Sequence, residues 1–292
     1  MKILILGSSG LLGSYLYRLA KAEGRNVTGL SRSKTRFTDV QCDAQDRPRL
    51  EEIIEAGKFG AVINAIKYKG STDQCETDRQ ECWKTNAELP AFLARLQKKH
   101  GFLLVHVSTD WVFEGKEGEV YSEESEPRPV NYYSESKLAA EKEVEASANR
   151  FLIVRTTGIF GFEEPARNTF ARLLAAAKKG EKFEAATDQF SQPISCLELS
   201  RIIYDLIDRK ATGVFIADGR DYVSRYELAL RIAKFFKIGE KTVSPRDSTG
   251  RAIQIPKFLK VDVSKAEKAI GRRIRGLEEM FQELKDFESS QA

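Results

Sequence analysis

A tyrosine and a lysine four residues apart, Tyr133 and Lys137, lie in the segment NYYSESK. On a helix these side chains would share one face, one turn apart. A phenol has a pKa near ~10, so it transfers protons poorly at neutral pH unless a nearby ammonium lowers that pKa. The pair could therefore serve general acid–base chemistry. The same spacing joins Tyr17 and Lys21, for which a structural role on a helix surface is expected, so the spacing alone does not decide.

Hydroxyl side chains precede this pair at the end of an apolar segment. The string HVSTDWVFEG closes a predicted buried strand with Ser108, Thr109 and Asp110. Ligands of open α/β sheets bind beyond the carboxyl ends of strands. We expect Thr109 to hydrogen-bond a substrate carbonyl oxygen, Ser108 to lie at a cofactor and Asp110 on the substrate side. The alternative is an ordinary Ser/Thr turn at a strand end.

A glycine-rich loop, GSSGLLG, joins the first predicted strand to the first predicted helix. Glycine permits a tight turn, close approach of the backbone to a pyrophosphate, and close contact between helix and strand. The helix N-terminus adds amide donors and a partial positive charge. The spacing differs from Gly-x-Gly-x-x-Gly, although Gly10 and Gly13 share its final part. We predict a dinucleotide site here, lined by Gly7, Ser9, Gly10, Leu11, Leu12 and Gly13.

The end of the second predicted strand bears on which dinucleotide binds. An acidic residue there would bind the ribose 2′-hydroxyl of NAD, but GLSRSK carries Arg32 and Lys34 and no acid. A guanidinium suits a 2′-phosphate, so NADPH is favoured over NADH; the alternative is a solvated basic turn. Asp43 is expected on the adenine side. Three residues after the third strand are expected near the ribose and phosphates: Asn64, Ala65 and Ile66.

Strands and helices alternate along the first half of the chain. Apolar runs predict strands at 2–7, 26–32, 60–66, 102–110 and 150–158, with helices that include 11–24, 79–99 and 132–148. This order predicts an α/β fold, a doubly wound parallel sheet of the Rossmann type. Later helices (167–179, 197–209, 224–236, 276–287) and strands (183–186, 213–217) predict a smaller interleaved C-terminal lobe. We assign 1–158, with a return segment near 183–217, to NADP binding and 159–292 mainly to substrate binding.

The composition narrows the classes of partner. The chain has 292 residues, 31% of them charged, and a net charge of +4 from mixed signs. That suits a small anionic ligand and is too weak to indicate nucleic acid. No apolar run approaches the ~20 residues of a membrane span, and no signal peptide is evident.

Without a Cys-x-x-Cys pair, and with two histidines, no metal site is expected. Four reduced thiols in a cytoplasmic protein are predicted, at Cys42, Cys75, Cys82 and Cys196.

Several strings together resemble one family. The chain is similar to the extended short-chain dehydrogenase/reductases, and more narrowly to the dTDP-4-dehydrorhamnose reductase group. The likeness runs from Gly7 to Pro193, and its most specific part is STDWVFEG followed by NYYSESKLAAEK. The other strings that carry it are GSSGLLG, VINAIKY, RTTGIFG and DQFSQP.

The resemblance implies an NADPH-dependent reductase of a nucleotide-linked 4-keto sugar. In it, Tyr133 would donate a proton to the developing alkoxide. Lys137 would lower the tyrosine pKa and bind the nicotinamide ribose, and Thr109 would orient the carbonyl. Asn86 matches an asparagine with a structural or proton-relay role. The substrate contacts implied are Tyr68, Asp110, Gly158 and Gln189.

Departures from the family pattern leave undecided which sugar and which nucleotide base the substrate would carry. Gly158 stands where these reductases usually carry a tryptophan, and the usual Arg-Pro-x-x-Ser-x-Leu string near the C-terminus is absent. The NADP-holding regulatory β subunit of methionine adenosyltransferase belongs to the same broad group, so a non-catalytic role is an alternative. Retention of Thr109, Tyr133 and Lys137 favours an enzyme. A nucleotide-sugar epimerase, which would reuse NAD, is a third reading that Arg32 disfavours. A homodimer is compatible with the sequence.

Overall fold

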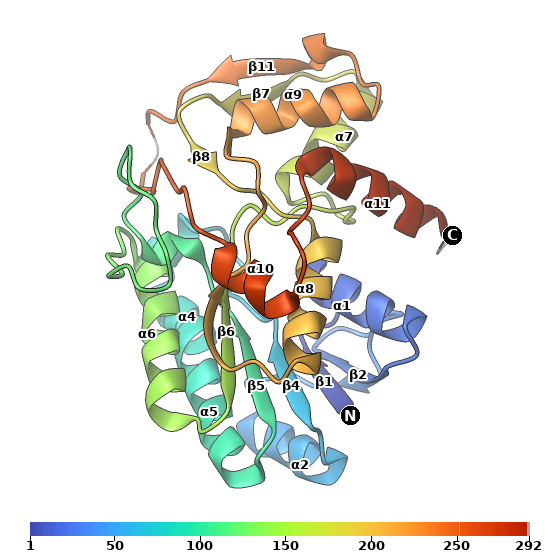
Figure 1. The fold of residues 1–292 in the computed structure, drawn as a ribbon, viewed down its shortest axis with the longest axis vertical. Coiled ribbons are helices and arrows are strands. Elements are labelled where there is room, and N and C mark those ends of the chain that lie inside the picture. Colours follow the sequence, from blue (N-terminus) through green and yellow to red (C-terminus); the bar gives the residue numbers. More distant parts are fainter. Residues whose placement is uncertain (251, 291–292) are drawn as a thin grey trace.

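A seven-stranded parallel sheet forms the centre of the protein, seen in a computed structural model that describes residues 1–250 and 252–290 (Figure 1). The strand order is β3-β2-β1-β4-β5-β6-β9, so the winding reverses between β1 and β4. This confirms the predicted doubly wound α/β fold. The strands are β1 (Lys2–Leu6), β2 (Asn26–Ser31), β3 (Val40–Gln41), β4 (Ala61–Asn64), β5 (Leu103–Val107), β6 (Phe151–Arg155) and β9 (Gly213–Ile216).

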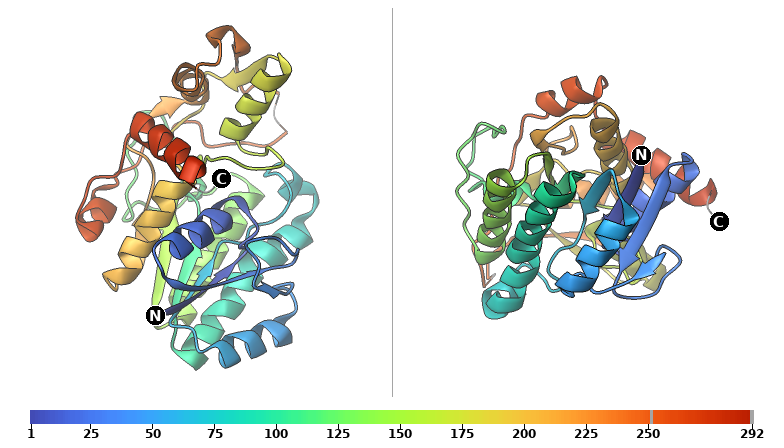
Figure 2. Two further views of the ribbon diagram at one scale, coloured as in Figure 1. Left: turned by 90° about the vertical axis from the view of Figure 1, so that its right-hand side faces the viewer. Right: turned by 90° about the horizontal axis from the view of Figure 1, so that it is seen from below.

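Helices cover both faces of this sheet (Figure 2). Along β1, Ile3 and Ile5 join the hydrophobic core under α1 (Leu11–Ala22) and α8 (Cys196–Asp208). Leu4 and Leu6 join the opposite core, as the alternation of side chains along a strand requires. The helices on that opposite side are α2 (Arg47–Gly57), α5 (Leu89–His100) and α6 (Tyr132–Ser147). The sequence reading missed α2, although Asp46 caps it by accepting from the Arg49 N–H.

A smaller lobe lies beyond the carboxyl ends of the strands (Figure 1). Its helices are α7 (Thr169–Lys179), α9 (Arg225–Phe235) and α11 (Leu277–Ser290), while α10 (Ser264–Ile270) packs against α8. Two short sheets complete the lobe: β7 (Phe183–Ala186) with β11 (Val243–Arg246), and β8 (Phe190–Ser191) with β10 (Val223–Ser224). The chain thus leaves the main sheet after β6 and returns to it through α8 and β9, so the lobes interleave.

The single helix predicted over 79–99 has three parts. It runs through α4 (Arg79–Trp83), a π-helical turn (Lys84–Glu88) and α5. Such turns are rare and recur at functional sites. This one holds Asn86, whose Oδ1 accepts from the Tyr68 N–H (2.8 Å) and whose Nδ2 donates to Ser136 Oγ (3.1 Å). Asn86 therefore connects the loop after β4 to α6.

The prediction of four free thiols is wrong for two of them. Cys75 on α3 (Gln74–Thr77) and Cys82 on α4 form a disulfide, with Cα atoms 5.4 Å apart. The bend at Asp78 between the two short helices brings them together, which the sequence spacing does not reveal. Cys42 and Cys196 are free and buried. The cysteines therefore no longer support the prediction of a reducing compartment.

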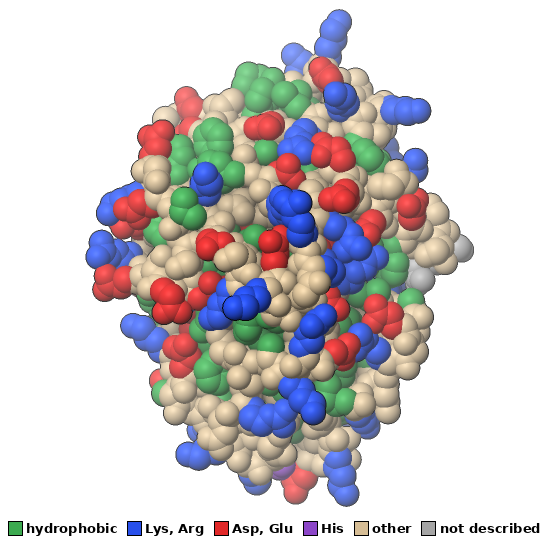
Figure 3. Space-filling view, viewed as in Figure 1, with side chains coloured by type: hydrophobic (Ala, Val, Ile, Leu, Met, Phe, Trp, Pro, Cys, Tyr) green, Lys and Arg blue, Asp and Glu red, His purple; other side chains and the backbone are tan. Residues whose placement is uncertain are grey.

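Charges of both signs intermix on the face of the molecule drawn in Figure 3. Exposed large hydrophobic side chains are few among the described residues, namely Met1, Trp83 and Val120. Across residues 1–250 and 252–290, no helix is long and apolar enough to cross a membrane.

Candidate active site

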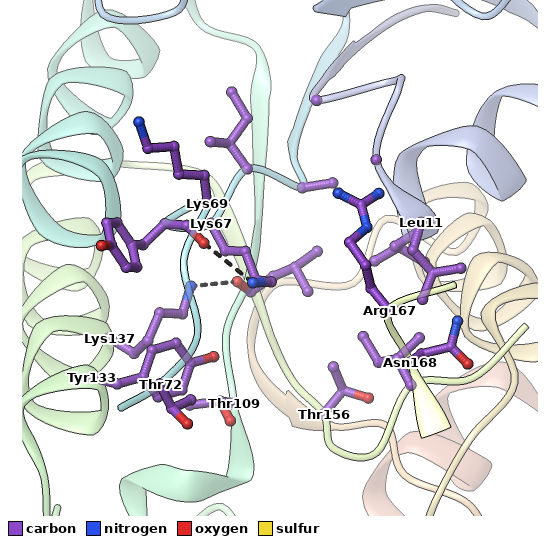
Figure 4. A pocket seen from close by; sticks show the side chains of 18 of the residues that line it. Leu11, Lys67, Lys69, Thr72, Thr109, Tyr133, Lys137, Thr156, Arg167 and Asn168 are labelled. Carbon is purple, nitrogen blue, oxygen red and sulfur yellow. Dashed lines mark hydrogen bonds between the residues drawn. The ribbon is translucent and has the colours of Figure 1, made fainter. Parts of the chain in front are cut away.

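A cavity of about 750 Å³ opens at the carboxyl end of the sheet, where the winding reverses (Figure 4). Its walls come from the glycine loop, the segments that follow β2, β4, β5 and β6, the start of α6, and the smaller lobe. This is where ligands of doubly wound folds bind. The volume also falls in the range of small-molecule and cofactor sites.

The glycine loop is shaped as a phosphate cradle. Gly7 has φ +82°, and a Cβ there would lie 3.0 Å from Ile66 Cγ1. Gly10 caps α1 without any side-chain cap, so the first N–H groups of the helix remain available to an anion. A Cβ on Gly13 would lie 2.1 Å from the Gly7 carbonyl oxygen, so only glycine lets α1 pack this closely. The chain therefore fits a dinucleotide pyrophosphate at this loop.

Most residues expected at the cofactor line the cavity. Gly13 and Asn64 do not. Gly13 packs beneath the loop, and Asn64 is fully buried with its side chain directed to Ile66 and His106. Those on the cavity wall are Gly7, Ser9, Gly10, Leu11, Leu12, Arg32, Asp43, Ala65, Ile66, Ser108, Tyr133 and Lys137.

Tyr133 and Lys137 extend from the first two turns of α6 into the cavity (Figure 4). The helix begins here because Asn131 caps it, its Oδ1 accepting from the Ser134 N–H at 2.9 Å. Lys137 is buried, and its Nζ donates to the Val107 carbonyl at 2.8 Å. The second tyrosine–lysine pair lies apart from this cavity: the Tyr17 hydroxyl donates to Asp39 at 3.0 Å.

Burial dominates the proton affinities of this pair. It raises the pKa of Tyr133 to about 12, with Thr109 opposing and Asp110 adding to the rise. The lowering of that pKa expected from Lys137 is not found, because Lys137 is not among the groups that shift it. Burial lowers the pKa of Lys137 to about 8, with Glu141 opposing and Lys67 adding to the fall. Tyr133 is therefore a neutral phenol, the form that can donate a proton.

Thr109 lies on the cavity wall beside Tyr133 (Figure 4). Its Oγ1 accepts from the Trp111 N–H at 3.2 Å, which begins a short helical turn. A hydroxyl also has one proton to donate. Among protein groups that proton faces Asp110 Oδ1, at a long 3.5 Å, and the hydroxyl of Tyr133, whose pKa Thr109 lowers. Thr109 can thus donate into the cavity.

Ser108 lines the cavity as expected, whereas Asp110 does not. The Ser108 hydroxyl donates to Glu141, a buried carboxylate that Arg155 also binds, with Nη2 at 2.7 Å. Ser108 therefore lines the cavity while supporting α6. Asp110 does not line the cavity. It is fully buried beside Asp218, and burial raises its pKa to about 8.

The remaining residues expected at the substrate, Tyr68, Gly158 and Gln189, line the cavity. The Tyr68 hydroxyl donates to Asp78 at 2.8 Å, which fixes the ring. Gly158 has φ +49° and lies against Pro193, 3.1 Å from a hypothetical Cβ, so a larger residue would be strained in this conformation.

The sequence reading missed several side chains of the wall. Thr156 and Thr157 follow β6 at the same sheet edge as Thr109, and the strand-end rule could have found them. Arg167 precedes α7 and Arg172 lies on it. Nothing in the sequence around either residue indicates that it lines a cavity. A second recess of about 380 Å³ adjoins the cavity, and both are lined by Thr169, Arg172, Gln189 and Arg225. Lys182 and Arg246 add positive charge to the recess.

Comparison with known proteins assigns the family. The model of the RmlD substrate binding domain matches residues 1–287. The chain belongs to this family. dTDP-4-dehydrorhamnose reductase of Burkholderia thailandensis is 34% identical over 193 residues, which are 66% of this chain and 61% of that protein.

Two further relatives cover nearly the whole chain. The structure of dTDP-4-dehydrorhamnose reductase from Bacillus anthracis in complex with NADP superimposes with a TM-score of 0.87 at 25% identity, over 99% of this chain and all of that one. The β subunit of methionine adenosyltransferase 2 from Xenopus laevis is 25% identical over 93% of this chain and 84% of that protein.

Proposed function

We propose that this protein is an NADPH-dependent reductase of a nucleotide-linked 4-keto sugar. The observation that carries the proposal is the convergence of a neutral phenol, a hydroxyl donor and a buried lysine (Tyr133, Thr109 and Lys137) on one cavity. That cavity also contains the glycine loop. The name of the Burkholderia relative supports the substrate class, and that of the Bacillus anthracis complex supports both the substrate class and NADP.

Each of the three residues has a distinct role in the proposed reaction. A dinucleotide held at the glycine loop through its pyrophosphate would supply hydride to the carbonyl carbon from its reduced nicotinamide. Thr109 donates a hydrogen bond to the carbonyl oxygen and stabilises the charge that develops there. Tyr133 then transfers its proton to that oxygen, so the sugar leaves as an alcohol and Tyr133 stays behind as a phenolate until it takes up a new proton. Lys137, which lines the same cavity, has the position to hold a ribose hydroxyl.

Preference for NADPH rests on Arg32, which lines the cavity after β2, where the 2′-phosphate of a bound cofactor would lie. We expect Arg32→Ala to weaken NADPH binding by about tenfold or more and NADH binding little, because it removes a charge-assisted contact. Lys34, which is absent from the cavity wall, offers the matched control Lys34→Ala. Equal losses for both cofactors, measured by calorimetry, would remove the 2′-phosphate assignment.

The basic recess beside the cavity supports a substrate with a phosphate group. Arg172, Arg225, Lys182 and Arg246 line it, with Glu184 as an acidic member. Arginine and lysine side chains bind phosphate oxygens through charge-assisted hydrogen bonds. A sugar in the cavity could thus extend a diphosphate into the recess.

The direct test is oxidation of NADPH in the presence of a panel of dTDP-, UDP- and GDP-linked 4-keto sugars. We expect turnover with at least one of them, and a kcat about 10²–10⁴-fold lower for Tyr133→Phe, with NADPH binding retained. Tyr17→Phe, in the tyrosine–lysine pair outside the cavity, is the matched control. Full turnover by Tyr133→Phe would show that another group donates the proton.

A non-catalytic regulator is the second candidate, because the Xenopus relative is named as a subunit of another enzyme. That function predicts a stable complex with a larger enzyme whose kinetics change on binding. Purified protein that turns over a nucleotide sugar alone, as a monomer or homodimer by light scattering, would exclude it as the main function.

A further inference from the structure

Two buried polar side chains next to Lys137 do not line the cavity, and the proposed reaction leaves them without a role. They are His106 on β5 and Asn64 at the end of β4, paired neighbours in the parallel sheet. Both are fully buried. His106 Nε2 lies 3.4 Å from Lys137 Nζ, and His106 Nδ1 lies 3.3 Å from Asn64 Nδ2. The three side chains form a chain of contacts that ends at the proposed active site.

The orientation of the Asn64 amide is set by the backbone. Its Oδ1 accepts from the Ile66 N–H at 3.2 Å. Rotating the amide by half a turn would place Nδ2 against this N–H, donor against donor. Nδ2 therefore faces the imidazole and donates to His106 Nδ1, which must carry a lone pair.

The tautomer of His106 follows from that contact. Burial, with the Lys137 charge adding to it, lowers the pKa of His106 well below its usual range, so the ring is neutral. A neutral imidazole with a lone pair on Nδ1 carries its proton on Nε2, the nitrogen that faces Lys137. The ammonium can donate to the Val107 carbonyl at 2.8 Å, but not to an N–H. The longer 3.4 Å separation of Nζ and Nε2 agrees with this.

We propose that Asn64, acting through His106, is a positioning residue that controls the protonation of Lys137; the importance of this control rests on the proposed reductase function. An Nε2–H directed at Lys137 opposes the charged ammonium and donates to the neutral amine. The Asn64–His106 pair therefore lowers the pKa of Lys137, so the lysine loses its proton more readily above neutral pH. It requires no contact of Asn64 or His106 with substrate.

Other charged groups also act on Lys137 and stay in place when Asn64 is changed. Glu141, one turn along α6, raises its pKa, and Lys67, after β4, lowers it. Arg155 of β6 is bound to Glu141. Tyr133, on the same helix, is neutral over the working range. A change in the pKa of Lys137 on an uncharged substitution, Asn64→Leu, can thus be traced to the tautomer of His106.

The tautomer can be measured directly without substrate. The chain has two histidines, so 15N-histidine labelling gives two ring systems, and His100→Gln assigns them. Two-bond 15N–1H correlations distinguish protonated from unprotonated ring nitrogens. We expect His106 to be neutral between about pH 6 and 9, with its proton on Nε2. In Asn64→Asp the carboxylate would accept from Nδ1–H, so the proton would move to Nδ1.

The pH profile of kcat supplies the second readout. With a lone pair on Nε2, Asn64→Asp would hold the Lys137 ammonium, so the high-pH loss of activity should move up by about one pH unit or more. Asn64→Leu, which introduces no buried charge, should shift the tautomer the same way, and His100→Gln should change neither readout. A proton on Nδ1 in the unaltered protein would overturn the proposal. So would a variant of Asn64 in which the proton moves to Nδ1 but the loss of kcat at high pH stays at the same pH. An Nε2 proton in a protein that reduces no 4-keto sugar would leave the tautomer assignment standing and reject the proposed function.

Discussion

Asp110 and Asp218 are a pair of fully buried carboxyl groups beneath the wall of the cavity. Within residues 1–250 and 252–290, Asp110 Oδ2 and both side-chain oxygens of Asp218 have no hydrogen-bond partner. Burial raises the pKa of each, and the Asp110 charge further raises the pKa of Asp218, while the neighbouring Thr156 and Thr157 partly oppose these rises. The pair therefore retains at least one proton at neutral pH.

This pair should make the free energy of unfolding depend on pH in the direction opposite to an ordinary ion-paired aspartate. The unfolded chain loses the Asp110 proton near pH 3.8, whereas the folded chain keeps it to about pH 8. The contribution of Asp110 to stability therefore falls as the pH rises between these values and is constant above them. Over the three pH units from 5 to 8, at about 1.4 kcal/mol per unit, the loss from Asp110 has an upper bound on the order of 4 kcal/mol, and Asp218 adds to it in the same direction. Local relaxation and water entry reduce it, so we expect at least about 1 kcal/mol.

Asp218→Asn removes one ionisable group and keeps the shape of the side chain. Urea unfolding should show that the variant loses less stability than the unaltered protein between pH 5 and pH 8, by about 1 kcal/mol or more. Asp286→Asn, on the exposed side of α11, is the control and should follow the unaltered protein. If the curves for Asp218→Asn and the unaltered protein run parallel over this range, the pair is already ionised in the folded state and our reasoning fails.

Three further substitutions test the architecture around the site. Gly13→Ala places a Cβ 2.1 Å from the Gly7 carbonyl oxygen, so we expect a loss of about 1–3 kcal/mol in urea unfolding; unchanged stability would mean that α1 can move away freely. Arg155→Met leaves the buried Glu141 carboxylate without its cation and should cost about 3–5 kcal/mol, a value that a neutral Glu141 would not give. Arg172→Ala should raise KM for the nucleotide sugar about tenfold with kcat retained, and an unchanged KM would argue against phosphate binding in the recess.

Local patterns in the sequence were sufficient for the fold and for much of the cavity wall. The apolar runs gave the five long strands, and strand-end logic placed Thr109 beside the helix that starts at Asn131. Both signals are local, and parallel strands of a doubly wound sheet end at one edge. The same rule, applied to β6, would have added Thr156 and Thr157. The Asp46 cap before Pro48 was also a readable start for α2.

The features that sequence reading missed depend on contacts between distant segments. Asp218 follows β9, which is separated from β5 by β6, and no local pattern says that it faces Asp110. The Cys75–Cys82 disulfide requires the bend between α3 and α4. The proton affinity of Tyr133 was misjudged because i,i+4 spacing to Lys137 does not reveal burial, which is the largest cause of the raised pKa.

The cost of the buried ionisable groups bears on the choice between an enzyme and a regulator. Burying Lys137, Asp110, Asp218 and the Glu141–Arg155 pair opposes folding, because each group must leave water. Binding a dinucleotide at the glycine loop requires none of them, since backbone N–H groups and a helix N-terminus suffice. Acid–base catalysis, in contrast, needs ionisable groups with shifted pKa values next to a proton donor such as the neutral phenol of Tyr133. The distribution of these groups, gathered behind Tyr133 and Thr109, therefore supports a protein that moves protons as well as binding a cofactor.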